Sequence, residues 1–385
     1  MATNNNDKTL NVPPLRFPEF SGEWEEEQLD SIATLSKGIG ISKEQLSEDG
    51  EPCILYGELY TKYKSEIIKQ VESKTDIDCS KLKRSKANDV IIPCSGETAV
   101  DIATARCVPF DNILLGGDLN IISLHKYDGA FMSYQLNGKR KYDIARVAQG
   151  VSVVHLYGEH LKAIKTYNPS LPEQQKIAKL LSLIDERIAT QNKIIEDVKK
   201  LKSAIIKKIF SLLKDEYTKS FEINQLLDYE QPTAYIVAND EYSTDTRLTP
   251  VLTANKGFIL GYTDEKNGIY QKGACIIFDD FTMDAKYVSF PFKVKSSAIK
   301  ILTAKPNVNL RFMFEYLSHW ELKSEEHKRH YISEISPLVI ELPSKEKQNI
   351  IALLMTSLNN KLTIEEKAKI RYEVQKGYLL SQMFI

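Results

Sequence analysis

Two stretches of the chain repeat apolar residues at helical spacing over many turns. Residues 171–210 and 342–384 each open with Leu-Pro, and proline is tolerated there because the first turn of a helix has no N–H partner to lose. In the first stretch the apolar positions advance mostly in steps of three or four residues, the spacing of a coiled-coil seam, and Gln191 fills the missing step. The seam residues are Leu181, Ile184, Ile188, Ile195, Val198, Leu201 and Ile205. The pattern predicts a long amphipathic helix.

The second stretch is a copy of the first. A shift of 174 positions places apolar residues on apolar residues, as for Ile184 and Leu358. Glu365 lies near the stripe of the copy and Gly377 lies late in it, so we expect its last turns to fray or bend. Two unrelated core helices are the alternative, but they would match in register only by accident. The seam of the copy is expected at Leu354, Leu358 and Leu362.

A helix of this length cannot bury its apolar stripe alone. At 1.5 Å per residue it is about 60 Å long, and its equivalent in the chain is the other copy. Each helix also follows a globular segment of similar size. We therefore expect a mixed α/β protein in which two globular domains are joined by two long helices, packed as an antiparallel coiled coil with pseudo-twofold symmetry.

The globular segments differ from the helices in composition and in pattern. Short apolar runs bounded by turn residues predict strands at 89–92, 119–122 and 274–278. In both segments a buried strand runs into a polar loop and a later turn feeds another strand, which indicates diverged copies of one fold. Phe290, Phe292 and Val294 alternate with Lys293 and Lys295, which predicts a strand with a basic outer face. The predicted boundaries are a leader at 1–19, domains at 20–170 and 212–341, and helices at 171–211 and 342–385.

Net charge, apolar runs and cysteines indicate which classes of protein the composition favours. There are 51 basic and 52 acidic residues, so the net charge of −1 gives no overall attraction to nucleic acid, and a DNA-binding role would need segregated basic residues. We find no run of about eighteen apolar residues and no signal peptide, so we expect a cytoplasmic protein that does not enter a membrane. The five cysteines form no CxxC pair and are expected to be buried reduced thiols.

Signatures of catalysis are missing where they would be easy to recognise. The chain has no phosphate-binding loop, no Gly-rich nucleotide motif and no histidine set at metal-ligand spacing. Asp279, Asp280, Asp284 and Lys286 could hold Mg²⁺ for phosphodiester cleavage. They lie on one loop, however, and aspartate can also accept a hydrogen bond from cytosine N4 in the major groove. We therefore favour a recognition loop and expect no catalytic residue and no metal site.

Several loops carry groups suited to DNA. The segment YGELYTKY offers hydroxyl and ammonium donors for phosphates, and the segment SGET offers backbone N–H groups and an acceptor. Comparable groups occur in the second half of the chain, and partial packing of the tyrosines is the alternative explanation. The residues concerned in the first half are Tyr56, Tyr60, Lys62, Tyr63, Ser95, Gly96, Glu97 and Thr98, and those in the second half are Thr253, Asn255, Lys256, Asp279, Asp280 and Thr282.

These motifs resemble those of a known family. The entry segment VPPLRFPEFSGEWEEEQLDSIATLSKGIGIS, the loop CILYGELYTKY, the run VIIPCSGETAVDIA, the turn GGDLNII and the helix LPEQQKIAKLLSLIDERIATQNKIIEDVKKLK are similar to specificity subunits of Type I restriction-modification systems. The resemblance covers nearly the whole chain. It implies two target recognition domains that alternate with two helical spacers, which is the order indicated by the repeat.

The resemblance also implies partners. A specificity subunit binds double-stranded DNA and two modification subunits, which carry S-adenosylmethionine and methylate adenine, and restriction subunits that use ATP and Mg²⁺ can join the complex. No cofactor is then expected on this chain. Each recognition domain would read half of a bipartite site through the loops at 56–63, 95–98, 253–256 and 279–282, and the helices would contact the modification subunits.

Two other functions compete with this one. A stand-alone nuclease or a fused restriction-modification enzyme would need an S-adenosylmethionine site and a full acidic cluster, and both are missing from the sequence. A coiled-coil adaptor with no nucleic-acid role would lack salt-sensitive DNA binding in its assembled complex.

Overall fold

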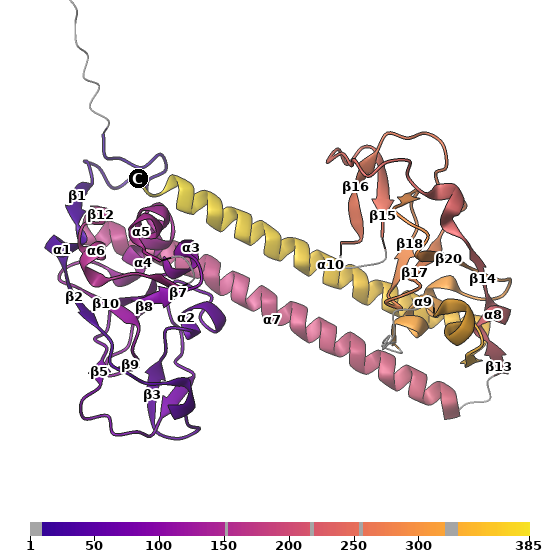
Figure 1. The fold of residues 1–385 in the computed structure, drawn as a ribbon, viewed down its shortest axis with the longest axis horizontal. Coiled ribbons are helices and arrows are strands. Elements are labelled where there is room, and N and C mark those ends of the chain that lie inside the picture. The colour runs from indigo at the N-terminus through magenta and orange to yellow at the C-terminus, as the bar shows by residue number, and fades with distance from the viewer. Residues whose placement is uncertain (1–9, 151–152, 216–218, 254–256, 320–329) are drawn as a thin grey trace, which may run out of the picture. The chain divides into compact units, whose positions relative to one another are not determined.

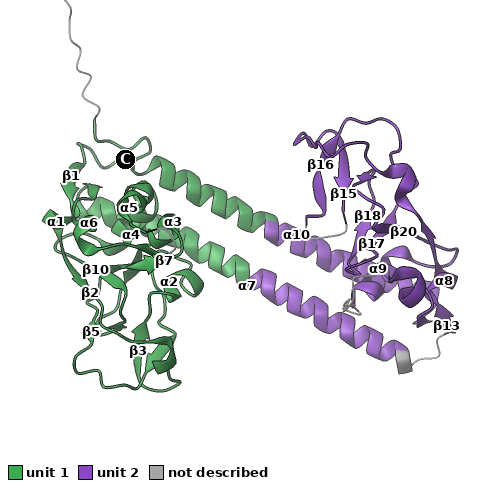
Figure 2. Ribbon diagram, in the orientation of Figure 1, with its two compact units in different colours: residues 1–192, 367–385 green, residues 193–366 purple. Residues whose placement is uncertain are grey.

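The computed structural model describes residues 10–150, 153–215, 219–253, 257–319 and 330–385. It divides into two compact units (Figure 2): unit 1 contains Met1–Asn192 and Lys367–Ile385, and unit 2 contains Lys193–Glu366. The units cut across the linear boundaries expected from the sequence because each long helix contributes to both. These helices are α7, Leu171–Asp215, with 45 residues, and α10, Lys345–Gln382, with 38 residues (Figure 1).

The long helices begin close to the predicted positions. The carbonyl of Ser170 accepts hydrogen bonds from the N–H groups of Glu173 and Gln174, both at 3.0 Å, which starts α7. Its end at Asp215 lies beyond the predicted limit of 211. The expectation that α10 would fray or bend near Gly377 is wrong, because the helix continues to Gln382. Its end is held by tertiary packing, which outweighs the low helix propensity of one glycine.

In unit 1 an antiparallel sheet has the strand order β2-β10-β6-β8. Strands β6 and β10 confirm the strands predicted at 89–92 and 119–122, and helix α4 packs on this sheet. A second sheet, β4-β3-β9-β5, pairs β3 with β9 in parallel. The strands are β1 Glu25–Gln28, β2 Ala33–Lys37, β3 Glu51–Ile54, β4 Ser73–Thr75, β5 Lys83–Arg84, β6 Asp89–Pro93, β7 Ser95–Gly96, β8 Arg106–Val108, β9 Leu114–Leu115, β10 Leu119–Leu124, β11 Val154–His155 and β12 Lys165–Asn168. The helices are α1 Leu29–Ile32, η1 Lys43–Gln45, α2 Glu58–Thr61, α3 Ala99–Ile102, α4 Gly129–Asn137, α5 Lys141–Val147 and α6 Gly158–Lys162.

Unit 2 repeats this plan. Its antiparallel sheet has the order β14-β20-β17-β18, and helix α9 packs on this sheet. Its second sheet, β16-β15-β19, again contains one parallel pair, β15 with β19. The strand predicted at 274–278 is confirmed as β17. The strands are β13 Lys219–Glu222, β14 Leu227–Glu230, β15 Thr249–Leu252, β16 Ile259–Thr263, β17 Cys275–Asp279, β18 Ala285–Val288, β19 Lys293–Val294, β20 Ile299–Ala304 and β21 Val339–Leu342, and the helical segments are α8 Ile223–Leu226, η2 Pro232–Tyr235, α9 Leu310–His319 and η3 Tyr331–Ile335.

The basic outer face predicted beside Phe292 is wrong at one position. Lys293 is buried, and its Nζ lies 2.6 Å from the Glu265 carboxylate and donates to the carbonyl of Asn267 at 2.8 Å. The buried ammonium is stable because the carboxylate and the carbonyl replace its water. Alternation along a sequence identifies two faces, but it does not show that the second face is covered.

The duplication extends to individual hydrogen bonds. The Nε2 group of Gln174 donates to the carbonyl of Pro169 at 2.8 Å, and its Oε1 accepts from the N–H of Asp128 at 2.9 Å. In unit 2 the same two bonds are made by Gln348, to Pro343 at 2.9 Å and from Asn309 at 2.8 Å. Each glutamine is buried and joins the start of a long helix to the residue before α4 or α9. The two units are therefore diverged copies, as the sequence repeat predicts.

The long helices pair antiparallel within each unit. In unit 1 the start of α7 clusters with the end of α10, through Ile177 and Leu181 on one helix and Phe384 just beyond the other. In unit 2 the end of α7 clusters with the start of α10, through Phe210 and Met355. Both pairings confirm the antiparallel arrangement. No helix in the described part of the chain is long and apolar enough to cross a membrane.

Burial along the two helices follows the predicted seam only in part. Leu181, Ile184 and Ile195 are buried, while Ile188, Val198, Leu358 and Leu362 are half-buried. Leu354 is 40% exposed, and the adjacent Met355 is fully buried in its place. Leu201 is also exposed. Where neighbouring positions are all apolar, as in ALLM, the pattern cannot tell which residue faces the partner helix.

Candidate nucleic-acid interface

The loops selected from the sequence follow equivalent strands in the two units. In unit 1 they come after β3 and β6, and in unit 2 they come after β15 and β17. Strands β3 and β15 each form the parallel pair of the second sheet, and β6 and β17 each lie inside the four-stranded sheet. A rigid sheet thus supports a loop at the same place in each copy, which is a common way to position binding residues.

In unit 1 the two loops meet at a cleft. The cleft has a volume of about 540 Å³. The Tyr60 hydroxyl donates to the Ser95 carbonyl at 3.4 Å, which joins the loops. A Cβ on Gly96 would lie 3.0 Å from the Tyr60 hydroxyl oxygen, so a larger residue there would require the Tyr60 side chain to shift slightly. The cleft is lined by Tyr56, Gly57, Tyr60, Thr61, Ser95, Gly96, Glu97, Asp101 and Val153.

The cleft is acidic and rich in hydroxyl groups. Glu97 is exposed, and Asp101 adds a second carboxylate that accepts from the Thr98 hydroxyl at 2.6 Å. Burial raises the pKa of Tyr60, so its hydroxyl stays protonated near neutral pH and can donate a hydrogen bond. These groups suit the amino groups and acceptor atoms on base edges better than they suit phosphate.

Three other predicted residues of these loops have structural partners. The Lys62 ammonium lies 2.7 Å from Glu58 and donates to Ser73 at 2.5 Å, so it is held against its own domain. The Thr98 hydroxyl accepts from the N–H of Asp101 at 3.1 Å and caps α3. Ser95 is buried, and its hydroxyl lies 3.2 Å from Asp118.

Three further predicted residues are buried in their own domain. Tyr63 is 6% exposed and belongs to the core beneath the loop. Asp279 is 4% exposed, and its Oδ1 accepts from the N–H groups of Phe281 and Thr282, both at 2.9 Å. Asp280 is 1% exposed and lies 3.3 Å from the equally buried Lys300. The two aspartates shape the loop and do not face solvent.

The other predicted residues of unit 2 lie in different surroundings. Thr253 is half-buried and its N–H donates to the Phe258 carbonyl at 3.0 Å, whereas Thr282 is exposed. Asn255 and Lys256 lie outside the described residues. A nearby groove of about 400 Å³ was not expected from the sequence. It is lined by Thr246, Arg247, Leu248, Thr249, Pro250, Ile259, Tyr262, Phe290 and Pro291.

Sequence reasoning also missed residues beside the cleft of unit 1. Strand β11 pairs with β7, which sets His155 opposite Ser95. The His155 ring stacks on Tyr157 with centroids 6.1 Å apart, and both side chains are exposed. Exposed stacked rings next to a polar cleft can pack against nucleotides. The sequence HLYGEH contains the aromatic residues, but only the strand pairing shows that they adjoin the 95–98 loop.

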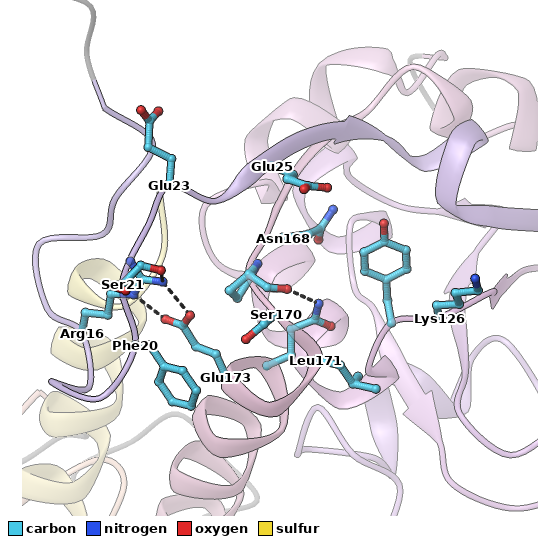
Figure 3. A pocket seen from close by; sticks show the side chains of 13 residues that line it. Arg16, Phe20, Ser21, Glu23, Glu25, Lys126, Asn168, Ser170, Leu171 and Glu173 are labelled. Carbon is cyan, nitrogen blue, oxygen red and sulfur yellow. Dashed lines mark hydrogen bonds and ion pairs between the residues drawn. The ribbon is translucent and has the colours of Figure 1, made fainter.

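Two further features bear on ligands and metals. A pocket of about 380 Å³ lies at the start of α7 (Figure 3), where Arg16 forms a two-bond fork with Glu173 at 2.7 Å for each bond. This pairing fastens the N-terminal segment to the helix. Within the described ranges we find no cluster of three or more His, Cys, Asp or Glu residues that could hold a metal ion. All five cysteines are free thiols, and four of them are buried.

Comparison with known proteins identifies the family. The model of the Type I restriction modification DNA specificity domain matches residues 21–200 and 215–374. The chain is similar to the specificity subunit of the Type I restriction enzyme EcoR124I/EcoR124II of Escherichia coli, with 39% identity over 178 residues, which are 41% of this chain and 43% of that protein. The match thus spans less than half of that relative. It is also similar to the putative Type I restriction enzyme MjaX specificity subunit of Methanocaldococcus jannaschii, with 23% identity over 413 residues, covering 97% of this chain and 96% of that protein.

Solved structures share the fold. The S subunit of a Type I restriction-modification system from M. genitalium has a TM-score of 0.71 and 18% identity, covering 97% of this chain and 99% of that chain. A chain from a study of complex assembly and conformational transition of the type I R-M system has a TM-score of 0.53 and 11% identity, covering 96% and 99%. With the family model matched in both halves, the chain belongs to the family of Type I restriction-modification DNA specificity proteins.

Proposed function

We propose that this chain is the DNA-reading subunit of a Type I restriction-modification complex and that each globular domain reads one half of a bipartite site. The observation that carries the proposal is the duplication. Two copies of one fold present loops after equivalent strands, and the DNA specificity domain matches once in each copy. In unit 1 the loops form the cleft whose acceptors and hydroxyl donors suit base edges.

The long helices supply surface for protein partners. Apolar side chains that are more than half exposed recur along α10, and exposed apolar surface can mark an interaction site. We propose that two modification subunits dock on the helices and that restriction subunits join the complex through them. The exposed residues are Ile350, Leu353, Ile364, Ile370, Val374 and Tyr378.

We propose that the chain is not itself an enzyme and carries no cofactor. Methylation would use S-adenosylmethionine on the modification subunits, and translocation and cleavage would use ATP and Mg²⁺ on the restriction subunits. The cytoplasm, where a bacterial or archaeal chromosome lies, is the proposed location. A purified chain that cut or methylated DNA with Mg²⁺ or S-adenosylmethionine present would show instead that it is a stand-alone or fused enzyme.

The decisive experiment maps N6-methyladenine in a host genome with and without this chain. We expect a two-part motif with a fixed gap that disappears when the chain is deleted and returns when it is supplied again. A methylation pattern unaffected by deletion would exclude the proposed function. An assembled complex that contains the chain but shows no salt-sensitive DNA binding would favour the coiled-coil adaptor instead.

The cleft of unit 1 can be tested separately. Replacing Glu97 by Gln exchanges one acceptor oxygen for a donor at an exposed position, so base preference at one position of the first half-site should change. The expected effect is about 1–3 kcal/mol, or roughly 5- to 150-fold in affinity. Glu48→Gln, an exposed acid that does not line the cleft, is the matched control. The methylated sequence should change in one half-site for Glu97→Gln. It should change in neither half-site for Glu48→Gln.

A further inference from the structure

A buried ionic cluster in unit 1 joins the helix pair to the globular domain. The Lys376 ammonium of α10 lies 2.6 Å from Glu66 of the domain and 2.7 Å from Asp185 of α7. Asp185 also accepts hydrogen bonds from the Tyr134 hydroxyl at 2.6 Å and the Ser65 hydroxyl at 3.1 Å. Glu66 and Asp185 are less than a tenth exposed. One lysine therefore connects three parts of the unit that are far apart in sequence.

Unit 2 contains a cluster of the same design. The Lys202 ammonium of α7 lies 3.2 Å from Glu315 of α9, which is fully buried. The other oxygen of Glu315 accepts from Asn359 of α10 at 3.0 Å and lies 3.1 Å from the Arg311 guanidinium. Here too a lysine near the end of one long helix meets an acid of the globular domain and a polar residue of the other helix.

The two clusters are equivalent under the sequence repeat. The shift of 174 positions that aligns the apolar stripes also places Lys202 on Lys376 and Asp185 on Asn359. The two acids come from different parts of the domain, since Glu66 lies between α2 and β4 and Glu315 lies on α9. The same lysine position has thus kept a buried partner in both copies, although the partner comes from another part of the domain.

Stability alone does not explain such clusters. Burying charged groups removes their hydration, and apolar residues of similar volume often stabilise a protein as well or better. The best-attested role of a buried polar group in a helix pair is to fix register, because any shifted arrangement leaves the group without its partner. An apolar seam distinguishes poorly between registers one heptad apart, so a specific polar contact is needed to select one.

We propose that Lys202 and Lys376 are positioning residues that fix where each globular domain sits along the helix pair, and so select one gap length in the DNA site. This inference rests on the proposed function. A slip of one heptad moves a helix by about 10 Å, which corresponds to about three base pairs of DNA. Without these lysines the complex would accept sites with additional gap lengths.

The test is made in the assembled complex with its modification subunits. In one variant Lys376→Met is combined with Glu66→Gln and Asp185→Asn, so that no charge is left buried without a partner. In another, Lys202→Met is combined with Glu315→Gln. Mapping of N6-methyladenine should give one gap length for the wild type and further gap lengths for each variant. A residue that only stabilises the fold would lower total methylation and leave the gap unchanged.

Two lysines on the same helices, the exposed Lys199 and the half-buried Lys369, lie outside the clusters and provide controls. Lys199→Gln on α7 and Lys369→Gln on α10 remove a charge near the solvent and should keep the single gap. If the multiple variants fail to assemble, Lys202→Gln and Lys376→Gln remove the ammonium group but keep a polar side chain, and they should still broaden the range of gaps. Single-gap methylation at wild-type levels in the Lys→Gln variants would overturn the inference. A wild-type chain that yields no bipartite motif would instead overturn the proposed function.

Discussion

At the scale of single residues, the buried glutamines Gln174 and Gln348 make the most specific contacts of the duplicated plan. Each accepts a hydrogen bond from the backbone N–H of the residue before α4 or α9, and each donates one to a backbone carbonyl just before a long helix. Replacing Gln174 by Met keeps the volume but leaves both backbone groups unpaired, which should cost about 2–4 kcal/mol in the free energy of unfolding. Gln175→Met, at an exposed position, is the control and should change little. Urea unfolding followed by circular dichroism measures the difference, and equal stabilities would contradict this role.

Glu66 should make stability depend on pH. Burial raises the pKa of Glu66, and the nearby Asp185 adds to this effect although Lys376 opposes it. The folded protein therefore holds a proton at pH values where the unfolded chain has lost it. This group favours folding most at low pH, and its contribution falls as the pH rises above 4.5, the usual value for glutamate.

Glu66→Gln removes this titration because an amide does not ionise. We expect the free energy of unfolding of the wild type, relative to that of the variant, to fall as the pH rises above 4.5. Urea unfolding of both proteins at a series of pH values measures this difference. If the difference in the free energy of unfolding between the wild type and Glu66→Gln stayed constant with pH, Glu66 would have the same pKa in the folded protein and in the unfolded chain.

The candidate site shows what sequence reasoning can and cannot reach at this scale. Residue chemistry identified the loops at 56–63 and 95–98, and the structure brings Tyr56, Tyr60 and Glu97 to one cleft. Residue chemistry could not show that Tyr60 lines the cleft while Tyr63 belongs to the core. The direction of each side chain depends on the short helix α2 and the sheet beneath it. Asp279 resembles an exposed acid in the sequence, but it turns inward to accept hydrogen bonds from its own loop.

At the scale of elements, periodicity predicted both long helices because the apolar stripe is a local property repeated over many turns. Their partners and exact ends depend on contacts far along the sequence. The last turns of α10 illustrate this point: Gly377 suggests fraying, yet Phe384 beyond them is fully buried among Trp24 and Phe131 of the N-terminal domain. The centroids of the Phe131 and Phe384 rings are 5.2 Å apart.

This aromatic cluster predicts that the end of α10 stabilises unit 1. Phe384→Ala removes a buried ring from between two others and should cost about 3–5 kcal/mol in the free energy of unfolding. Phe290→Ala in unit 2 provides the control, since Phe290 is 39% exposed. Amide hydrogen exchange should show lost protection in β1 and α4 of unit 1 in the first variant alone. Unchanged protection there would mean that the end of α10 is dispensable for the domain.

At the scale of the whole molecule, the proposed function requires that helix length set the gap between the half-sites. Deleting one heptad from α7 between Asp185 and Lys202, and one from α10 between Asn359 and Lys376, keeps both ionic clusters and the stripe in phase. Each helix shortens by about 10 Å, so the gap should shrink by up to about three base pairs. N6-methyladenine mapping would reveal this as the same two half-site sequences at a shorter distance. Deleting the heptad from one helix alone should abolish methylation, because the helices could no longer satisfy both clusters together. A gap unchanged by the paired deletion would mean that DNA or the partner subunits, and not the helix pair, determine the spacing.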